Sequence, residues 1–184
     1  MAQRLNKRLE NAQKEKIQTF LPFLCCPITH DKLISIEPDL VGTESQDHQY
    51  SIVSGIPLFA KQFYSKEARQ QERHYDSIAG IYQENLSYPH TIEYMNYLDE
   101  VLLSNLPDGD LGDVAEVCCG SGEGFTLLKD RVNKGVGIDI SVSMLKFACE
   151  EHQYPNLFFA QGDALSLPLE NNSFDNVIML GGIH

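Results

Sequence analysis

The spacing of hydrophobic and polar positions divides the chain into four stretches. Residues 1–20 are polar with sparse apolar positions at helical spacing, and they predict an N-terminal helix. Residues 21–62 contain short apolar pieces separated by prolines and glycines, which is typical of a small β-rich module. Residues 63–110 predict a helical cover or linker with a break at Pro89. The fourth stretch, 111–184, has a different pattern.

Continuous apolar runs alternate with helical spacing over residues 111–184. The expected strands span residues 113–118, 135–138, 157–160 and 176–180, and the expected helices span about 122–131 and 143–152. Strands of this kind are buried on both faces, so the alternation predicts an α/β fold with a parallel sheet between helices.

Composition and charge narrow the class of protein. The chain has 184 residues, of which 42% are hydrophobic and 22% charged, and this excludes wholesale disorder. No apolar run approaches the roughly 20 residues that a membrane span requires, and the charged N-terminus does not look like a secretory signal. We therefore expect a cytoplasmic protein without membrane contact. The formal net charge of −12 disfavours nucleic acid as a partner.

Acidic side chains and glycines stand where three of the predicted strands end. Glu116 belongs to the first strand, and Gly120 and Gly122 lie in the turn before the next helix, where glycine lets the backbone approach a ligand closely. The alternative is a tight strand-to-helix connection. Asp139 ends the second strand, where an acid can accept hydrogen bonds from ribose hydroxyls or can cap a helix. Asp163 follows the third strand, as a ligand group or a turn former. Together they predict a nucleoside site.

Residues 113–184 resemble the first half of a class I S-adenosylmethionine-dependent methyltransferase. The motifs are Glu-x-Cys-x-Gly-x-Gly at 116–122, Gly-Ile-Asp-Ile-Ser-x-x-Met-Leu at 137–145, Gly-Asp-Ala-x-x-Leu-Pro at 162–168 and Ser-Phe-Asp-Asn-Val-Ile at 173–178. The resemblance is to the small-molecule group that includes ubiquinone and menaquinone biosynthesis methyltransferases. It implies a Rossmann-like sheet and S-adenosylmethionine as the cofactor.

The resemblance also implies roles for individual residues. Glu116 would lie near the methionine ammonium, directly or through water, and Gly120 and Gly122 would make room for the cofactor. Asp139 would hold the ribose hydroxyls.

The adenine and the methyl donor have implied neighbours too. Ile140 and Met144 would border the adenine, Asp163 would accept a hydrogen bond from its amino group, and the Ala164 amide would donate one. Further implied neighbours, on the methyl-donor side, are Leu180 and Gly181. His184 is the candidate base for an acceptor that must lose a proton, or else a residue that only lines the site.

Two features depart from the family pattern. Cys118 replaces the first glycine of the turn, and we expect a β conformation there, with Cys118 and Cys119 as small buried apolar residues. The family's sheet has seven strands, whereas the sequence supplies four, in the expected order 3-2-1-4. The strand at 176–183 is therefore expected as an open edge. A fragment of a longer protein, a partner chain or a second copy would each account for it.

The module at 21–62 resembles a degenerate zinc-ribbon domain. Cys26-Pro27-Ile28-Thr29 has Thr29 where a second cysteine would stand, and a later cysteine pair is absent. Four possible ligands remain, which are Cys25, Cys26, His30 and His48. Because adjacent cysteines rarely share one tetrahedral ion, we expect no metal and a role as a lid, substrate wall or interface.

The sequence therefore predicts an enzyme that transfers a methyl group to a small-molecule acceptor, with activity of the 184-residue chain alone left open. One alternative is an RNA methyltransferase, which the ribbon-like module favours and the charge opposes. The other alternative is a non-catalytic module that binds the cofactor or a protein partner.

Overall fold

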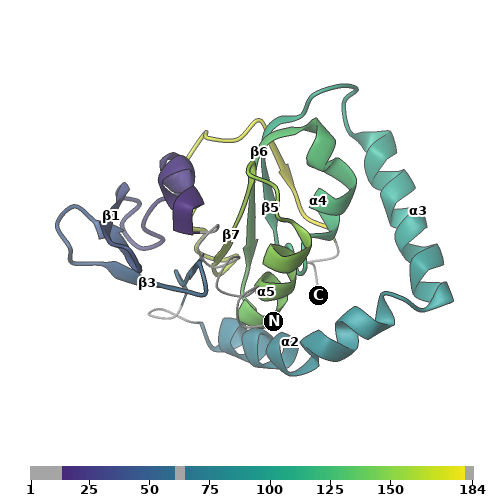
Figure 1. Cartoon of the computed structure of the whole chain (residues 1–184), viewed down its shortest axis with the longest axis horizontal. Coiled ribbons are helices and arrows are strands. Elements are labelled where there is room, and N and C mark those ends of the chain that lie inside the picture. The colour runs from purple at the N-terminus through teal and green to yellow at the C-terminus, as the bar shows by residue number, and fades with distance from the viewer. Residues whose placement is uncertain (1–13, 61–64, 181–184) are drawn as a thin grey trace.

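The computed structural model describes residues 14–60 and 65–180, and its C-terminal part is built on one parallel sheet (Figure 1). The sheet contains β5 (Gly112–Val117), β6 (Val132–Asp139), β7 (Leu157–Gln161) and β8 (Asn176–Ile178). Their spatial order is β7-β6-β5-β8, with parallel pairing throughout. The order 3-2-1-4 is thus confirmed, and with it the partial Rossmann-like α/β fold.

The connecting helices follow the predicted alternation, with small differences in their bounds. The helix expected at 122–131 is α4 (Glu123–Leu128) followed by a 3₁₀ turn, η2 (Lys129–Arg131). The second helix is α5 (Val142–Glu151). β6 begins three residues before the apolar run that predicted it, because its polar start pairs with the start of β5. Local polarity does not reveal this pairing.

A hydrophobic core lies between the sheet and helices α4 and α5. It contains Phe125, Leu128, Leu145 and Phe159, all fully buried. All five side chains of β7 are buried, as expected for a strand covered on both faces. The apolar run of β7 therefore predicts its burial correctly, whereas Val177 of the edge strand β8 is 65% exposed.

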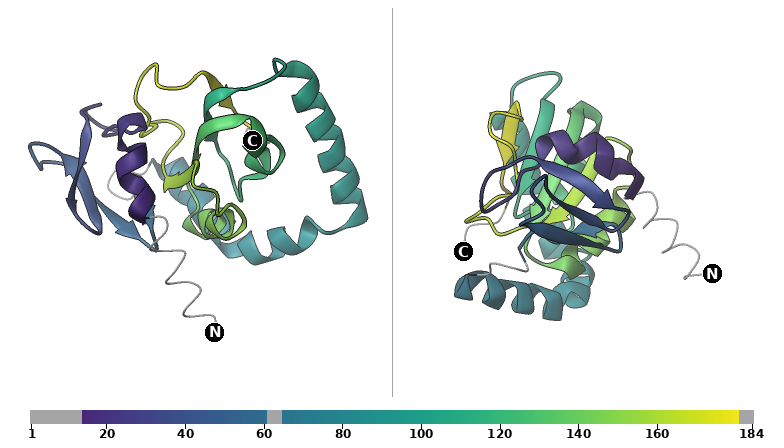
Figure 2. Two further views of the ribbon diagram at one scale, coloured as in Figure 1. Left: turned by 45° about the horizontal axis from the view of Figure 1, so that its top comes forward. Right: turned by 90° about the vertical axis from the view of Figure 1, so that its left-hand side faces the viewer.

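The N-terminal module covers the other face of the parallel sheet. Residues 14–20 are helical and lead into η1 (Leu21–Phe23). An antiparallel sheet follows, formed by β1 (Leu33–Glu37), β2 (Leu40–Thr43), β3 (Gln49–Val53) and β4 (Ile56–Pro57). Figure 2 shows this module beside the parallel sheet, away from α3.

The module shares its core with the parallel sheet. The ring of Phe20 stacks on that of Phe158 in β7, with centroids 5.1 Å apart. Leu58 forms a parallel bridge to Gln161, and the Phe59 amide donates to the Gln161 carbonyl at 3.0 Å. The chain after β4 therefore covers the β7 edge of the sheet.

Two helices connect the module to β5. α2 (Lys66–Asn85) begins at the N-cap Ser65 and runs beside α5, whereas α3 (Pro89–Asn105) lies apart (Figure 1). Pro89 is at the start of α3, as predicted from its fixed backbone angle. No residue of α3 is buried. Helix α2 therefore lies against α5, while α3 reaches the core through its half-buried Leu102.

The described residues were searched for membrane-spanning helices and for clusters of metal-ligating side chains. None of the helices in the described part of the chain has the length and apolar character of a membrane span. No three His, Cys, Asp or Glu side chains gather as metal ligands within residues 14–60 and 65–180. The Cys26 sulfur instead lies 3.0 Å from the Tyr50 hydroxyl, and the Cys25 thiol donates to the Leu169 carbonyl at 3.2 Å.

Candidate cofactor site

The turn after β5 has an unusual backbone. Cys118, Gly120 and Gly122 have φ values of 56°, 54° and 85°, all in the left-handed region. The expectation of a β conformation for Cys118 is therefore wrong, because the chain reverses from strand to helix within a few residues and needs positive φ at this position. Cys119 is buried as expected, whereas Cys118 is half-buried. Burial raises the pKa of both thiols, so they are protonated at neutral pH.

Asp139 lies at the end of β6, directly beside this turn. Its Oδ2 accepts a hydrogen bond from the Gly120 amide at 2.9 Å, and its Oδ1 accepts one from the Ser141 amide at 2.8 Å. Ser141, and not Asp139, is the N-cap of α5, since its hydroxyl accepts from the Met144 amide. Burial raises the pKa of Asp139, although the amide hydrogen bonds oppose that shift. Each carboxylate oxygen keeps a further lone pair for a hydroxyl donor.

Asp163 lies on the neighbouring turn, after β7. Its Oδ1 accepts from the Leu165 amide at 2.9 Å, and the Ser65 hydroxyl donates to its Oδ2 at 3.4 Å. The turn-forming role is therefore present. The Gly162 amide donates to the Asp139 carbonyl at 2.9 Å, so the two acidic turns are adjacent. Ala164, the predicted amide donor, is exposed.

Glu116 lies beneath the turn and not on its surface. Its side chain is 1% exposed, and its Oε1 accepts from the Gly124 amide at 3.1 Å. Its Oε2 has no hydrogen-bond partner among the described residues. Burial raises its pKa to about 8. The predicted contact with the methionine ammonium stays a prediction.

The other predicted residues are distributed around the turn. Met144 is buried, and its Cε lies 3.5 Å from where a Cβ on Gly120 would be. Ile140 and Leu180 are half-buried. Gly181 and His184 lie outside the described residues.

Helix α2 contributes polar side chains to the site, and two of them, Asp76 and Gln83, were not assigned to it from the sequence. Asp76 Oδ1 accepts from the Ser141 hydroxyl, and Gln83 Nε2 donates to the Ser121 hydroxyl at 2.7 Å. Tyr82 shares a hydrogen bond with Glu123. The spacing of seven between Asp76 and Gln83 places both on one helix face, which is the signal that could have identified them.

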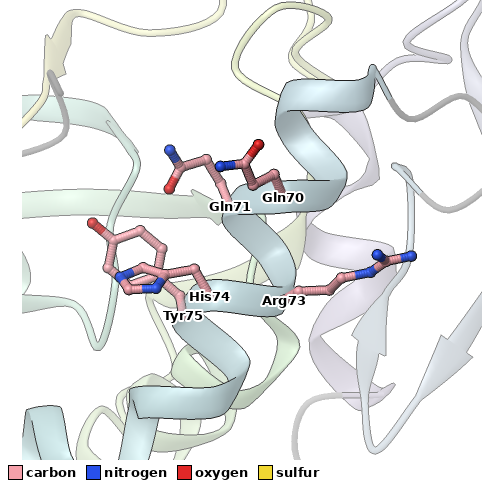
Figure 3. Close-up of a pocket in the computed structure, with 5 residues that line it drawn as sticks. All are labelled: Gln70, Gln71, Arg73, His74 and Tyr75. Carbon is pink, nitrogen blue, oxygen red and sulfur yellow. The ribbon is translucent and has the colours of Figure 1, made fainter.

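A cavity of about 710 Å³ opens on the same helix and is lined by Gln70, Gln71, Arg73, His74 and Tyr75. Figure 3 shows His74 and Tyr75 projecting from one side of α2, while Arg73 points the other way. Burial and the charge of Asp139 raise the pKa of Tyr75. Tyr75 thus lies close to Asp139 as well as lining the cavity.

This geometry suits a ligand with vicinal hydroxyls. Two adjacent turns at the carboxyl edge of a parallel sheet present Asp139 and Asp163, and the neighbouring turn has glycines at Gly120 and Gly122. Open α/β sheets bind their ligands at this edge. The residues present therefore fit an adenosyl group.

Comparison with known proteins relates the C-terminal part of the chain to methyltransferases. Residues 114–184 match the model of a methyltransferase domain family. A phthiotriol/phenolphthiotriol dimycocerosates methyltransferase of Mycobacterium leprae is 37% identical over 73 residues, which cover 39% of this chain and 27% of that protein. An uncharacterized protein of Methanocaldococcus jannaschii is 29% identical over 125 residues, which cover 67% of this chain and 45% of that protein.

A solved structure shares the fold. The cyclase SpnF aligns with a TM-score of 0.51 at 20% identity, covering 60% of this chain and 47% of that one. The present chain thus spans about a quarter of the mycobacterial relative and under half of the other two proteins. In its C-terminal part, over residues 114–184, the chain carries a class I methyltransferase domain, of a family of S-adenosylmethionine-dependent enzymes.

Proposed function

We propose that the protein transfers the methyl group of S-adenosylmethionine to a small-molecule acceptor. The observation that carries this proposal is the adjacency of Asp139, Asp163 and the Gly120 turn at one edge of the sheet. The names of the mycobacterial relatives give their acceptors as phthiotriol and phenolphthiotriol dimycocerosates, which are not nucleic acids. The net charge of −12 also disfavours RNA as the acceptor.

The chain's own residues would hold the cofactor at three places. Asp139 would accept hydrogen bonds from the ribose hydroxyls, with the Gly120 and Ser141 amides fixing its carboxylate. Asp163 would accept from the adenine amino group, and the Ala164 amide would donate to the ring. Ile140 and Met144 would border the adenine, as apolar side chains suit its faces.

Bound S-adenosylmethionine supplies a methyl group on a positively charged sulfur. Its transfer is an in-line displacement, so the protein's contribution is proximity and alignment of the acceptor. Leu180 and Gly181 would line the methyl-donor side, and His184 would remove a proton where the acceptor requires it. The acceptor pocket would be completed by another chain, a second copy or further sequence at β8, where Val177 is 65% exposed at the sheet edge.

Calorimetric titration with S-adenosylmethionine tests cofactor binding. We expect Asp139→Ala to weaken binding by at least about tenfold, because hydrogen bonds to a charged group are lost. Asp130→Ala is the matched control, since Asp130 is an exposed acid just before β6, at the opposite edge of the sheet. Absence of binding by the folded wild-type chain would contradict the proposal and favour a protein-interaction module.

Transfer of labelled methyl from the cofactor then identifies the acceptor class. Small-molecule extracts and total RNA are offered in parallel, with heat-treated protein as the control. We expect label in the small-molecule fraction. Label in RNA alone would contradict the proposal and support an RNA methyltransferase.

A further inference from the structure

The order of the strands indicates which end of the cofactor lies at the turn after β5. This inference rests on the proposed function, in which the chain binds S-adenosylmethionine. Neighbouring strands lie about 4.8 Å apart. Asp163 follows β7, Asp139 ends β6, and the next strand in the sheet is β5. With adenine at Asp163 and ribose at Asp139, the amino-acid end of the cofactor lies at the turn between Cys118 and Glu123.

Two carboxylates belong to this region, and the sequence motif points to Glu116. Its side chain is 1% exposed and lies under the backbone of Gly124, where an added Cβ would come within 2.6 Å of its Oε1. Burial raises its pKa to about 8, which favours the neutral acid at pH 7. A neutral, covered acid is a poor partner for an ammonium group.

Glu123, the first residue of α4, is the other carboxylate and is only partly buried. Its Oε2 lies 3.3 Å from where a Cβ on Gly120 would be. The amide of Gly120 donates to Asp139 Oδ2 at 2.9 Å. Gly120 therefore lies between the acid assigned to the ribose and the carboxylate of Glu123.

The Glu123 side chain is held in place from two directions. Its Oε1 accepts from the Ser121 hydroxyl at 2.7 Å, and Ser121 in turn accepts from Gln83 of α2 at 2.7 Å. The Tyr82 hydroxyl, also on α2, shares a hydrogen bond with Glu123. These donors fix the carboxylate while its remaining lone pairs stay available to a cation.

We propose that Glu123 accepts the α-ammonium group of the bound cofactor, and that Ser121, Tyr82 and Gln83 position its carboxylate for this contact. Glu116 then has a structural role beneath the turn, through its hydrogen bond from Gly124. Glu123 is thereby a residue that recognises the amino-acid end of the cofactor, separately from the acids that hold adenosine.

Two ligands separate this contact from the adenosine contacts. S-adenosylhomocysteine carries the ammonium group, and 5′-methylthioadenosine has the same adenosine and a thioether but lacks the amino-acid portion. In calorimetry, we expect Glu123→Gln to weaken the binding of S-adenosylhomocysteine by about tenfold or more. The affinity for 5′-methylthioadenosine should change by less than about twofold. Asp139→Asn should weaken the binding of both ligands, because both contain the ribose hydroxyls. Thermal unfolding of each variant establishes that it is folded.

Three outcomes would overturn the proposal for Glu123. One is unchanged affinity of Glu123→Gln for S-adenosylhomocysteine, and another is an equal loss for both ligands. The third is a selective loss in Glu116→Gln instead. If the folded wild-type chain binds neither ligand, the proposed function fails together with this inference. If the wild-type chain binds both ligands and one of these three outcomes is found, only the assignment of Glu123 fails.

Discussion

The Asp76 carboxylate of α2 accepts a hydrogen bond from the Ser141 hydroxyl at 2.5 Å, across 65 positions of sequence. The same oxygen accepts from the Ser143 amide at 3.0 Å, and Ser141 is itself the N-cap of α5. Together with the contact of Gln83 to Ser121, this ties α2 to the turns after β5 and β6. Helix α2 therefore covers the two turns that bear the candidate cofactor residues.

Removal of the Asp76 carboxylate should weaken the contact between α2 and the start of α5. We expect Asp76→Ala to lower the free energy of unfolding by about 1–2 kcal/mol, because two hydrogen bonds to a charged group are lost at a partly exposed site. Amide hydrogen exchange should accelerate in α2 more than in β6. Glu84→Ala, an exposed position on the same helix, is the control. Equal exchange rates of the α2 amides in the two variants would show that Asp76 does not hold α2 against the start of α5.

Glu116 should make stability depend on pH. Burial raises its pKa from the ordinary value of 4.5 to about 8, so between these values the folded chain holds a proton that the unfolded chain has released. This contribution to stability is therefore full below pH 4.5 and is lost as pH rises toward 8, at up to about 1.4 kcal/mol per pH unit.

Urea unfolding at several pH values tests this dependence. Glu116→Gln keeps the neutral shape and does not titrate, so its stability relative to wild type should increase steadily from pH 5 to pH 8. Glu150→Gln, at an exposed site on α5, controls for the loss of one surface carboxylate. Parallel stability curves for wild type and Glu116→Gln would show that the buried carboxyl group does not hold the proton.

Cys118 should be a strained position. A side chain in the left-handed region costs roughly 1–2 kcal/mol, and β-branched residues are accommodated least well there. We expect Cys118→Val to lower the free energy of unfolding by about 1–2 kcal/mol, and Cys118→Gly to leave it unchanged or raise it by up to about 1 kcal/mol. Cys118→Ala separates loss of the thiol from the backbone effect. Equal stability of the Val and Gly variants would contradict the strain.

The N-terminal module should unfold together with the parallel sheet. Phe20 is fully buried against Phe158, so Phe20→Ala should lower the free energy of unfolding by about 3–5 kcal/mol. Hydrogen exchange should then rise in β6 and β7 as well as in β3. Tyr97→Ala is the aromatic control, because Tyr97 is 61% exposed on α3. Faster exchange confined to the module would show that its core is independent.

The sequence determined the parallel sheet and the acids at the strand ends, because a continuous apolar run indicates a strand buried on both faces and the residue that ends such a strand lies at the carboxyl edge. Asp139 and Asp163 were therefore placed on one edge without coordinates. The helix break at Pro89 was equally local, because the proline ring fixes its own backbone angle. The strand order, in contrast, was implied by the resemblance to class I methyltransferases.

Only the tertiary structure decided which groups at that edge are covered. Glu116 lies beneath the turn because the backbone of Gly124 passes over it, and Glu123 lies on the turn with a hydrogen bond to Tyr82 of α2. The left-handed φ of Cys118 follows from the reversal between β5 and α4. These contacts join residues far apart in the chain, so burial and orientation depend on packing that no local pattern encodes.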